Sequence, residues 1–144
     1  MEKGLVDFET HTVYIAIGSN IGDKTKNLKT AIEEIDILIG QVTEVSSFFE
    51  NEPQGFKSDN IFVNACIICK TNLNPLATLK ELKKIEKKMG RKKTNGVYED
   101  RIIDLDIIFY DQLVFNSEKL TIPHKEYKKR NFILIPLAEL TPNN

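Results

Sequence analysis

The sequence predicts an α+β domain in which two helices cover one face of an antiparallel sheet. Three observations support this class. Four stretches are rich in β-branched and aromatic residues, two others repeat apolar residues at helical spacing, and together they run in the order β-α-β-β-α-β. That order is typical of a ferredoxin-like sandwich, to which this chain adds a C-terminal extension.

The first half of the chain contains one helix and three strands. Residues 13–17 form a short apolar strand that ends in the turn Gly18-Ser19-Asn20. A helix begins near Gly22 and ends at Gly40, and its buried stripe is Leu28, Ala31, Ile32, Ile35 and Ile39. The remaining segments are a strand, a loop and a strand, at residues 42–50, 52–60 and 61–70.

The second half begins with a helix that the sequence marks at both ends. Asn74 is predicted as the N-cap, Pro75 as the first helical residue and Gly90 as the stop, with a buried stripe of Leu76, Leu79, Leu82, Ile85 and Met89. Residues 91–100 are polar and basic, which predicts a long mobile loop, and the fourth strand follows at 101–110. Residues 1–12 are expected to be a flexible leader, and residues 13–144 a single domain.

Composition excludes several classes of function. The 144 residues carry a formal net charge of −1, which argues against general binding of nucleic acid or membrane surfaces. No apolar run approaches the roughly 20 residues of a membrane span, and the start of the chain lacks the apolar segment of a signal peptide. A cytoplasmic protein is therefore expected.

Cys66 and Cys69 have the Cys-x-x-Cys spacing of redox and zinc sites. Their setting reads as a strand, however, where positions three apart face opposite sides of the sheet. We expect two reduced, apolar thiols rather than a redox pair or a zinc site.

Asp104 and Asp106 are the main candidates for chemistry. In a strand they share one face, while Leu105 points toward the core with Ile103, Ile107 and Phe109. Neighbouring carboxylates repel each other, and a hard cation such as Mg²⁺ carrying nucleotide phosphates would neutralise them. The spacing alone fits a pair of solvated acids equally well.

Basic residues near the two acids favour phosphate chemistry. Arg91, Lys93 and Arg101 precede the pair, and Arg130 follows it after His124. Phosphoryl transfer uses such cations to hold the charge of the phosphate oxygens. No Gly-rich nucleotide-binding loop of the common kinds is present in the sequence. His124 fits either a phosphate donor or the simple end of a strand.

Phe62 and Asn64 share one face of the third strand. An aromatic ring beside an amide suits the stacking and hydrogen bonding of a flat heterocycle, although Phe62 also fits a core position.

Several of these elements together resemble the 6-hydroxymethyl-7,8-dihydropterin pyrophosphokinases of folate synthesis, from about residue 13 to residue 142. The elements that carry the resemblance are Gly18-Ser19-Asn20, Ser46-Ser47-Phe48-Phe49, Phe62-Val63-Asn64-Ala65, Glu86 with Gly90-Arg91, Arg101-Ile102-Ile103-Asp104-Leu105-Asp106-Ile107, and Leu120-Thr121-Ile122-Pro123-His124 followed by Arg130 and Phe132.

The resemblance implies a catalytic domain that transfers the pyrophosphoryl group of ATP to the hydroxymethyl oxygen of the pterin and releases AMP. It implies that Asp104 and Asp106 bind two Mg²⁺ ions and that Arg91 and Arg101 are also catalytic. The residues implied for ATP are Lys83, Glu86, Lys93, Ile107, Lys119, Thr121, His124 and Arg130. Those implied for the pterin are Asn51, Pro53, Gly55, Phe62, Asn64 and Phe132.

A monomer is expected, and its expected partners are these small molecules. Two other functions fit the same fold class. One is a different Mg²⁺-dependent nucleotidyl or phosphoryl transferase, and the other is an RNA-binding module that uses sheet aromatics. The near-neutral charge and the paired acids argue against the RNA-binding module.

Overall fold

The computed structural model describes residues 6–51, 61–90 and 102–140. In chain order the elements are β1 (Val6–Ser19), α1 (Lys24–Leu38), β2 (Gly40–Val45), β3 (Phe49–Asn51), β4 (Phe62–Leu73), α2 (Pro75–Lys88), β5 (Asp104–Tyr110), β6 (Phe115–Asn116), β7 (Thr121–Ile122), the 3₁₀ turn η1 (Tyr127–Lys129) and α3 (Asn131–Glu139).

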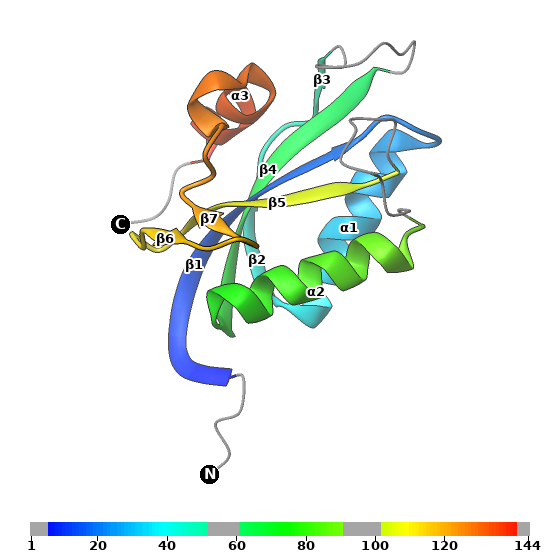
Figure 1. Ribbon diagram of the computed structural model, residues 1–144. Coiled ribbons are helices and arrows are strands. Elements are labelled where there is room, and N and C mark those ends of the chain that lie inside the picture. The colour runs from blue at the N-terminus through cyan, green and yellow to red at the C-terminus, as the bar shows by residue number, and fades with distance from the viewer. Residues whose placement is uncertain (1–5, 52–60, 91–101, 141–144) are drawn as a thin grey trace.

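The main sheet is antiparallel and has the strand order β2-β4-β1-β5, with β3 also paired to β4. Helices α1 and α2 lie together on one face, and α3 from the C-terminal extension lies on the other (Figure 1). The predicted ferredoxin-like class is confirmed. This topology places β1 in the sheet interior between β4 and β5, and it leaves β5 at an edge.

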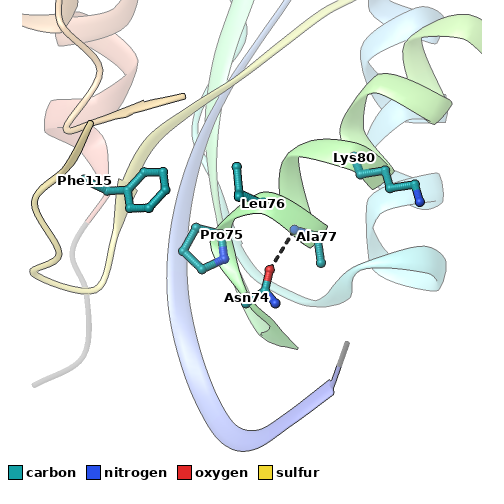
Figure 2. A pocket seen from close by; sticks show the side chains of 6 residues that line it. All are labelled: Asn74, Pro75, Leu76, Ala77, Lys80 and Phe115. Atoms are coloured by element: carbon teal, nitrogen blue, oxygen red, sulfur yellow. Dashed lines mark hydrogen bonds between the residues drawn. The ribbon is translucent and has the colours of Figure 1, made fainter. Parts of the chain in front are cut away.

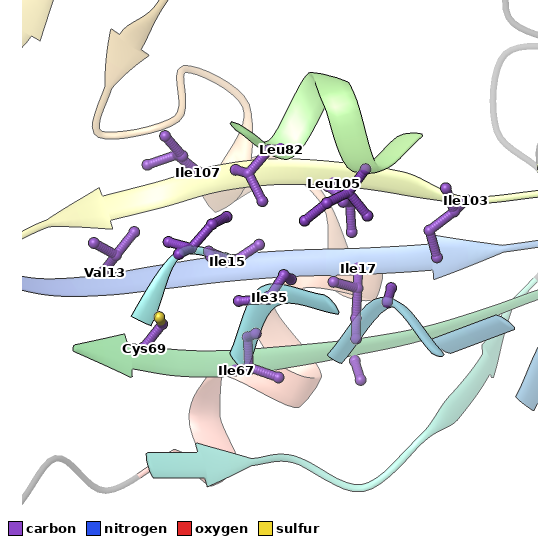
Figure 3. Packing of buried hydrophobic residues seen from close by; sticks show 14 of the residues in the cluster. Val13, Ile15, Ile17, Ile35, Ile67, Cys69, Leu82, Ile103, Leu105 and Ile107 are labelled. Atoms are coloured by element: carbon purple, nitrogen blue, oxygen red, sulfur yellow. The ribbon is translucent and has the colours of Figure 1, made fainter. Parts of the chain in front are cut away.

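The larger core lies between the sheet and helices α1 and α2 (Figure 3). Ile15 and Ile17 of β1 and Leu105 of β5 point into it and are fully buried or nearly so. They meet Ile35 of α1 and Leu82 of α2, as the helical spacing predicts. A second cluster on the opposite face packs under α3 and includes Cys66, Ile68, Ile108, Ile133 and Leu140.

Both predicted helix starts are confirmed, and one of the residues predicted to be buried on α2 is wrong. The Asp23 side chain accepts a hydrogen bond from the Lys26 N–H at 3.2 Å, so α1 begins just after Gly22. Asn74 caps α2 by accepting from the Ala77 N–H at 2.8 Å (Figure 2). The prediction that Leu76 is buried is wrong, since its side chain is 47% exposed and Ala77 faces the core instead.

The first strand begins at Val6. Residues 6–12, expected to belong to a flexible leader, are therefore part of β1. Thr12 pairs with Lys70 of β4, whose Nζ donates to the Thr12 hydroxyl at 2.6 Å. The carboxylate of Asp111 accepts from the Thr12 N–H at 2.8 Å and lies 2.7 Å from Nδ1 of His11. These bonds between polar groups replace the apolar pattern by which a strand is recognised in a sequence.

The second predicted strand is divided into β2 and β3. Ser46, between them, donates its N–H to the Cys66 carbonyl and accepts the Cys66 N–H on its hydroxyl, both at 2.9 Å. The Ser47 N–H donates to Glu139 of α3 at 2.8 Å. These side-chain bonds interrupt the ladder and direct the chain into β3.

Phe109 does not point with Leu105 as predicted. In the pairing of β1 with β5, Tyr14 lies opposite Phe109 while Ile15 lies opposite Ile107, so a bulge adds one residue to β5. The extra residue reverses the alternation. Phe109 therefore packs in the cluster under α3, edge-on to Tyr14 with ring centroids 5.5 Å apart.

The two cysteines are free, buried and on opposite faces of β4, as predicted. Burial raises the pKa of Cys66 to about 12, and burial together with the charge of Asp36 does the same for Cys69. Since the thiolate is the reactive form, we expect neither thiol of the native protein to react with a disulfide reagent at pH 8, while both react in denaturant. Rapid native labelling of either thiol would contradict this packing.

Among the described residues, no helix is both long and apolar enough to cross a lipid bilayer.

Candidate active site

Three neighbouring strands place polar groups in one row across the sheet. Gly18 of β1 lies opposite Asn64 of β4 on one side and opposite Asp104 of β5 on the other. Side chains at these positions point away from α1 and α2, toward the face that α3 partly covers. The row thus has an amide at one end, a carboxylate at the other, and no side chain in the middle.

Asp104 and Asp106 share that face, as the strand period predicts. Both are half-buried, whereas Leu105 between them is fully buried on the helix side. Ala16 lies opposite Asp106 in β1. The acids therefore stand beside the two β1 residues with the least side-chain bulk on this face, Ala16 and Gly18.

Gly18 is required for the position of Asn64. A Cβ atom at residue 18 would lie 2.5 Å from Asn64 Oδ1 and 3.7 Å from Phe62 Cδ1. The Asn64 side chain is 6% exposed, and its Nδ2 donates to the side-chain oxygen of Asn51 on β3. The Asn64 amide thus occupies space that any other residue at position 18 would fill.

The described part of the predicted pterin set converges at this end of the sheet. Asn51 lies opposite Phe62 in the β3–β4 pairing, and Phe62 shares a face with Asn64. Phe132, in the first turn of α3, packs against the cluster on the same side of the sheet. The structure therefore brings together an aromatic ring and amides from β3 and β4 and a second aromatic ring from α3.

Arg130 immediately precedes α3 and points back over Phe132. Its guanidinium carbon lies 5.6 Å from the centre of the Phe132 ring, within range of a cation–π interaction. This contact orients a cation toward the same face as the two acids.

His124 lies next to β5 on the acid-bearing side. Its N–H donates to the carbonyl of Ile108 at 3.0 Å, and its Nδ1 accepts from the Glu126 N–H at 3.0 Å. The second bond places the proton of the neutral ring on Nε2. Burial lowers the pKa of His124 and nearby Arg130 lowers it further, against the opposing charge of Asp104. His124 is thus a neutral N–H donor close to both Arg130 and Asp104.

This lowered pKa predicts a pH-dependent stability. The unfolded chain binds the His124 proton with the ordinary pKa near 6.5, and the folded chain binds it more weakly. The His124 contribution to the free energy of unfolding is complete above about pH 6.5 and is lost as the pH drops below that value. Thermal unfolding is measured at pH 8 and at pH 5.5. The drop in stability between the two should be larger for the wild type than for His124→Gln. Equal losses would contradict the prediction.

Glu86 is predicted for ATP, and the structure gives it a partner within the fold. It is 3% exposed, and its Oε2 accepts from the Leu105 N–H at 2.8 Å. Lys83 Nζ lies 3.4 Å from Oε1 of Glu86, with 55% of the Lys83 side chain exposed. Lys83 can therefore reach solvent and a ligand, whereas Glu86 is held against the strand that carries the acids.

Other residues predicted for ATP lie in two places. The Ile107 side chain is 3% exposed in the larger core, which leaves it almost no surface for a ligand. Lys119 and Thr121 lie in the β6–β7 hairpin, where the Thr121 hydroxyl donates to the Asn116 side chain at 3.2 Å. Five predicted site residues lie outside the described residues: Pro53, Gly55, Arg91, Lys93 and Arg101.

The acid pair fits a magnesium ion better than a closed metal site. Within the described ranges, no three His, Cys, Asp or Glu side chains gather as ligands. Mg²⁺ commonly takes one or two protein carboxylates and completes its shell with water and substrate phosphates. Asp104 and Asp106, half-buried beside Gly18 and Ala16, form such a donor set.

An apolar pocket of about 490 Å³ lies away from this site (Figure 2). It is lined by Asn74, Pro75, Leu76, Ala77, Lys80 and Phe115. Ala77 and Glu86 stand nine residues apart on α2, roughly 14 Å along its axis. The pocket contains no acid or histidine and adds nothing to the chemistry of the acid pair.

Sequence reasoning missed two structural roles at the site. Gly18 was assigned only to a turn, because its close approach to Asn64 depends on the pairing of β1 with β4. The contact of Glu86 with Leu105 adds a role within the fold to the role predicted at ATP, and its place one helical turn after Leu82 indicates the buried position.

Comparison with known proteins agrees with this geometry. Residues 14–142 match the family model described as 7,8-dihydro-6-hydroxymethylpterin-pyrophosphokinase. The chain is similar to the 2-amino-4-hydroxy-6-hydroxymethyldihydropteridine pyrophosphokinase of Porphyromonas gingivalis, with 36% identity over 133 residues covering 90% of each chain. It is also similar to the enzyme of that name from Aquifex aeolicus, with 36% identity, covering 92% of this chain and 81% of the other.

Longer proteins contain a similar segment. The folate synthesis bifunctional protein of Arabidopsis thaliana is 41% identical over 128 residues, which cover 89% of this chain and 26% of that protein. A crystal structure of a triple mutant of Plasmodium falciparum HPPK-DHPS shares the fold, with a TM-score of 0.76 and 17% identity over 98% of this chain. The present chain spans 42% of that solved chain. With the family model covering almost all of its length, the chain belongs to the 7,8-dihydro-6-hydroxymethylpterin-pyrophosphokinase family.

Proposed function

We propose that this protein transfers the pyrophosphoryl group of ATP to the hydroxymethyl oxygen of 6-hydroxymethyl-7,8-dihydropterin and releases AMP, in tetrahydrofolate biosynthesis. The observation that carries the proposal is the row of Asn64, Gly18 and Asp104 across three strands. It sets a hydrogen-bonding edge for a heterocycle beside a carboxylate suited to a metal-bound phosphate, with only the glycine of β1 between them.

The residues at the Asn64 end of the row would orient the pterin, whose hydroxymethyl group is the acceptor. The Asn64 amide would hydrogen-bond the pterin edge, held in place by Asn51. Phe62 and Phe132 would stack on the two faces of the ring and fix its plane, and the hydrogen bond from Asn64 would fix its rotation within that plane. Fixing both reactants in this way replaces a bimolecular encounter by an oriented one, which is a large part of the rate enhancement in such reactions.

The residues at the Asp104 end of the row would hold the triphosphate of ATP. Asp104 and Asp106 would bind the Mg²⁺ that, when present, neutralises charge on the phosphate oxygens. Arg130 would add a cation, and His124 an N–H donor from Nε2. The acceptor hydroxyl attacks the β-phosphorus and loses its proton to solvent, the bond from that phosphorus to the oxygen of the α-phosphate breaks, and AMP leaves with that oxygen. We further propose that Arg91, Lys93 and Arg101 hold the remaining charge.

The proposal extends to three further expectations from the sequence. We propose two Mg²⁺ ions per active site, a monomeric enzyme and a cytoplasmic location. Sedimentation of the protein at several concentrations tests the monomer, and counting bound Mn²⁺ in the presence of an ATP analogue tests the number of metal ions.

The direct test of the activity is the identity of the nucleotide product. Purified protein is incubated with ATP, Mg²⁺ and the hydroxymethyl dihydropterin, and the nucleotides are separated by chromatography. The proposal predicts AMP in a one-to-one ratio with pterin pyrophosphate, and no AMP when the pterin is omitted. ADP as the product, or AMP formed equally well without the pterin, would exclude this function.

A further inference from the structure

Glu86 is the one acid among the buried residues of α2, whose other members are Ala77, Thr78, Leu82 and Ile85. It lies in α2 beside Ile85 and one turn after Leu82, both fully buried in the larger core. A carboxylate in such a place is costly unless hydrogen bonds and an opposite charge compensate it. Glu86 has both, since Oε2 accepts the Leu105 N–H at 2.8 Å and Oε1 lies 3.4 Å from Lys83 Nζ.

The strand partner of Glu86 is the peptide group between the two acids. Because β5 is the edge strand beside β1, one row of its N–H groups faces away from the sheet. The Leu105 N–H belongs to that row. It is part of the peptide group that joins Asp104 to Leu105. Glu86 thus holds the backbone of the segment whose side chains, Asp104 and Asp106, leave it on the other face.

This contact supplies an orientation that the sheet alone does not. On its inner side the segment is fixed by pairing with Ile17 and its neighbours in β1. On its outer side the bond to Glu86 replaces the missing strand. A backbone fixed on both sides keeps two carboxylates at a constant spacing even though they repel each other.

We propose that Glu86 is a positioning residue, whose hydrogen bond to the Leu105 N–H fixes the Asp104–Asp106 segment in the geometry that binds metal and phosphate. The inference rests on the proposed function and refines it, since it assigns to the strand backbone a residue that the family resemblance assigns to ATP. Glu86 acts through Leu105.

Two substitutions separate the hydrogen bond from the charge. Glu86→Gln keeps an oxygen at the same reach and removes the charge, whereas Glu86→Asp keeps the charge and withdraws it by one methylene. The matched control is Glu81→Gln. Glu81 lies on the same helix and forms the same type of ion pair, with Lys84 Nζ 3.3 Å from its Oε2, and its side chain is 25% exposed.

Positioning by hydrogen bond predicts that Glu86→Asp has the larger effect. We expect its kcat to fall about 10- to 100-fold, and its affinity for Mn²⁺, titrated by electron paramagnetic resonance with a non-hydrolysable ATP analogue, to fall by a similar factor. The KM for the pterin should change less than about twofold, because the proposed pterin contacts lie on β3, β4 and α3. The kcat and the Mn²⁺ affinity of Glu86→Gln should lie within about threefold of the wild-type values. Those of Glu81→Gln should equal the wild-type values.

Each result decides the matter. A folded Glu86→Asp with wild-type kcat and Mn²⁺ affinity would overturn the inference. A second result would also overturn it, namely a Glu86→Gln whose kcat and Mn²⁺ affinity both fall more than tenfold. The second criterion also applies if Glu86→Asp fails to fold. If the wild type produces no AMP but binds Mn²⁺, the proposed function fails, and the Mn²⁺ titration of the variants still tests the inference. A wild type that forms AMP but binds no Mn²⁺ overturns the inference and leaves the proposed function standing.

Discussion

Asp104→Asn and Asp106→Asn should each reduce turnover at least about 1,000-fold, because each removes a charged metal ligand that acts most strongly in the transition state. The fold should persist in both variants. The two side chains are half-buried and leave the sheet on the face away from the larger core, so the packing of Leu105 between them is unchanged. Steady-state kinetics with AMP detection measures the loss, and circular dichroism verifies the fold.

The control for these variants is Glu33→Gln, the same type of change on an exposed position of α1. It should leave kcat and KM within about twofold of the wild type. A loss of less than tenfold in either aspartate variant would mean that the acids are solvated side chains of an outward strand face, the alternative that their spacing alone leaves open.

Gly18→Ala should weaken pterin binding by about 10- to 100-fold, the second largest effect that we expect. Its Cβ would lie 2.5 Å from Asn64 Oδ1, so the amide must move and lose its bond with Asn51. The clash involves the end of a side chain rather than the backbone, so the protein should keep most of its stability. The expected signature is a raised KM for the pterin with an unchanged KM for ATP.

Gly40→Ala provides the matched contrast. A Cβ at residue 40 would lie 2.0 Å from the carbonyl oxygen of Lys70, a backbone atom that cannot move without separating β2 from β4. This variant should lose stability by several degrees in thermal unfolding, without a selective change in the KM for the pterin. If Gly18→Ala behaved like Gly40→Ala, the role of Gly18 in placing Asn64 would be wrong.

The regular elements could be predicted because their residues report local physics. Asn74 and Pro75 mark the start of α2, and the alternation around Leu105 places both acids on one face. Each of these signals lies within a few residues of the feature that it predicts. The same holds for the buried thiols of Cys66 and Cys69, whose spacing in a strand separates them.

The features that the sequence did not predict depend on contacts distant along the chain. The bulge that turns Phe109 over appears only in the pairing with Tyr14 and Ile15. The entry of residues 6–12 into β1 depends on Lys70 and Asp111, and the contact of Glu86 with Leu105 joins residues 19 apart. None of these pairs leaves a periodic signal in the sequence, since each is specified by a single polar contact or by register.

The account depends most on Asp104 and Asp106 holding a metal-bound triphosphate. The most direct measurement is a crystal structure with Mn²⁺, a non-hydrolysable ATP analogue and the pterin, with anomalous scattering to locate the metal. We expect manganese peaks within ligand distance of oxygens of both aspartates and of the phosphates, and the pterin ring between Phe62 and Phe132. Bound nucleotide with no manganese at either carboxylate would contradict the account.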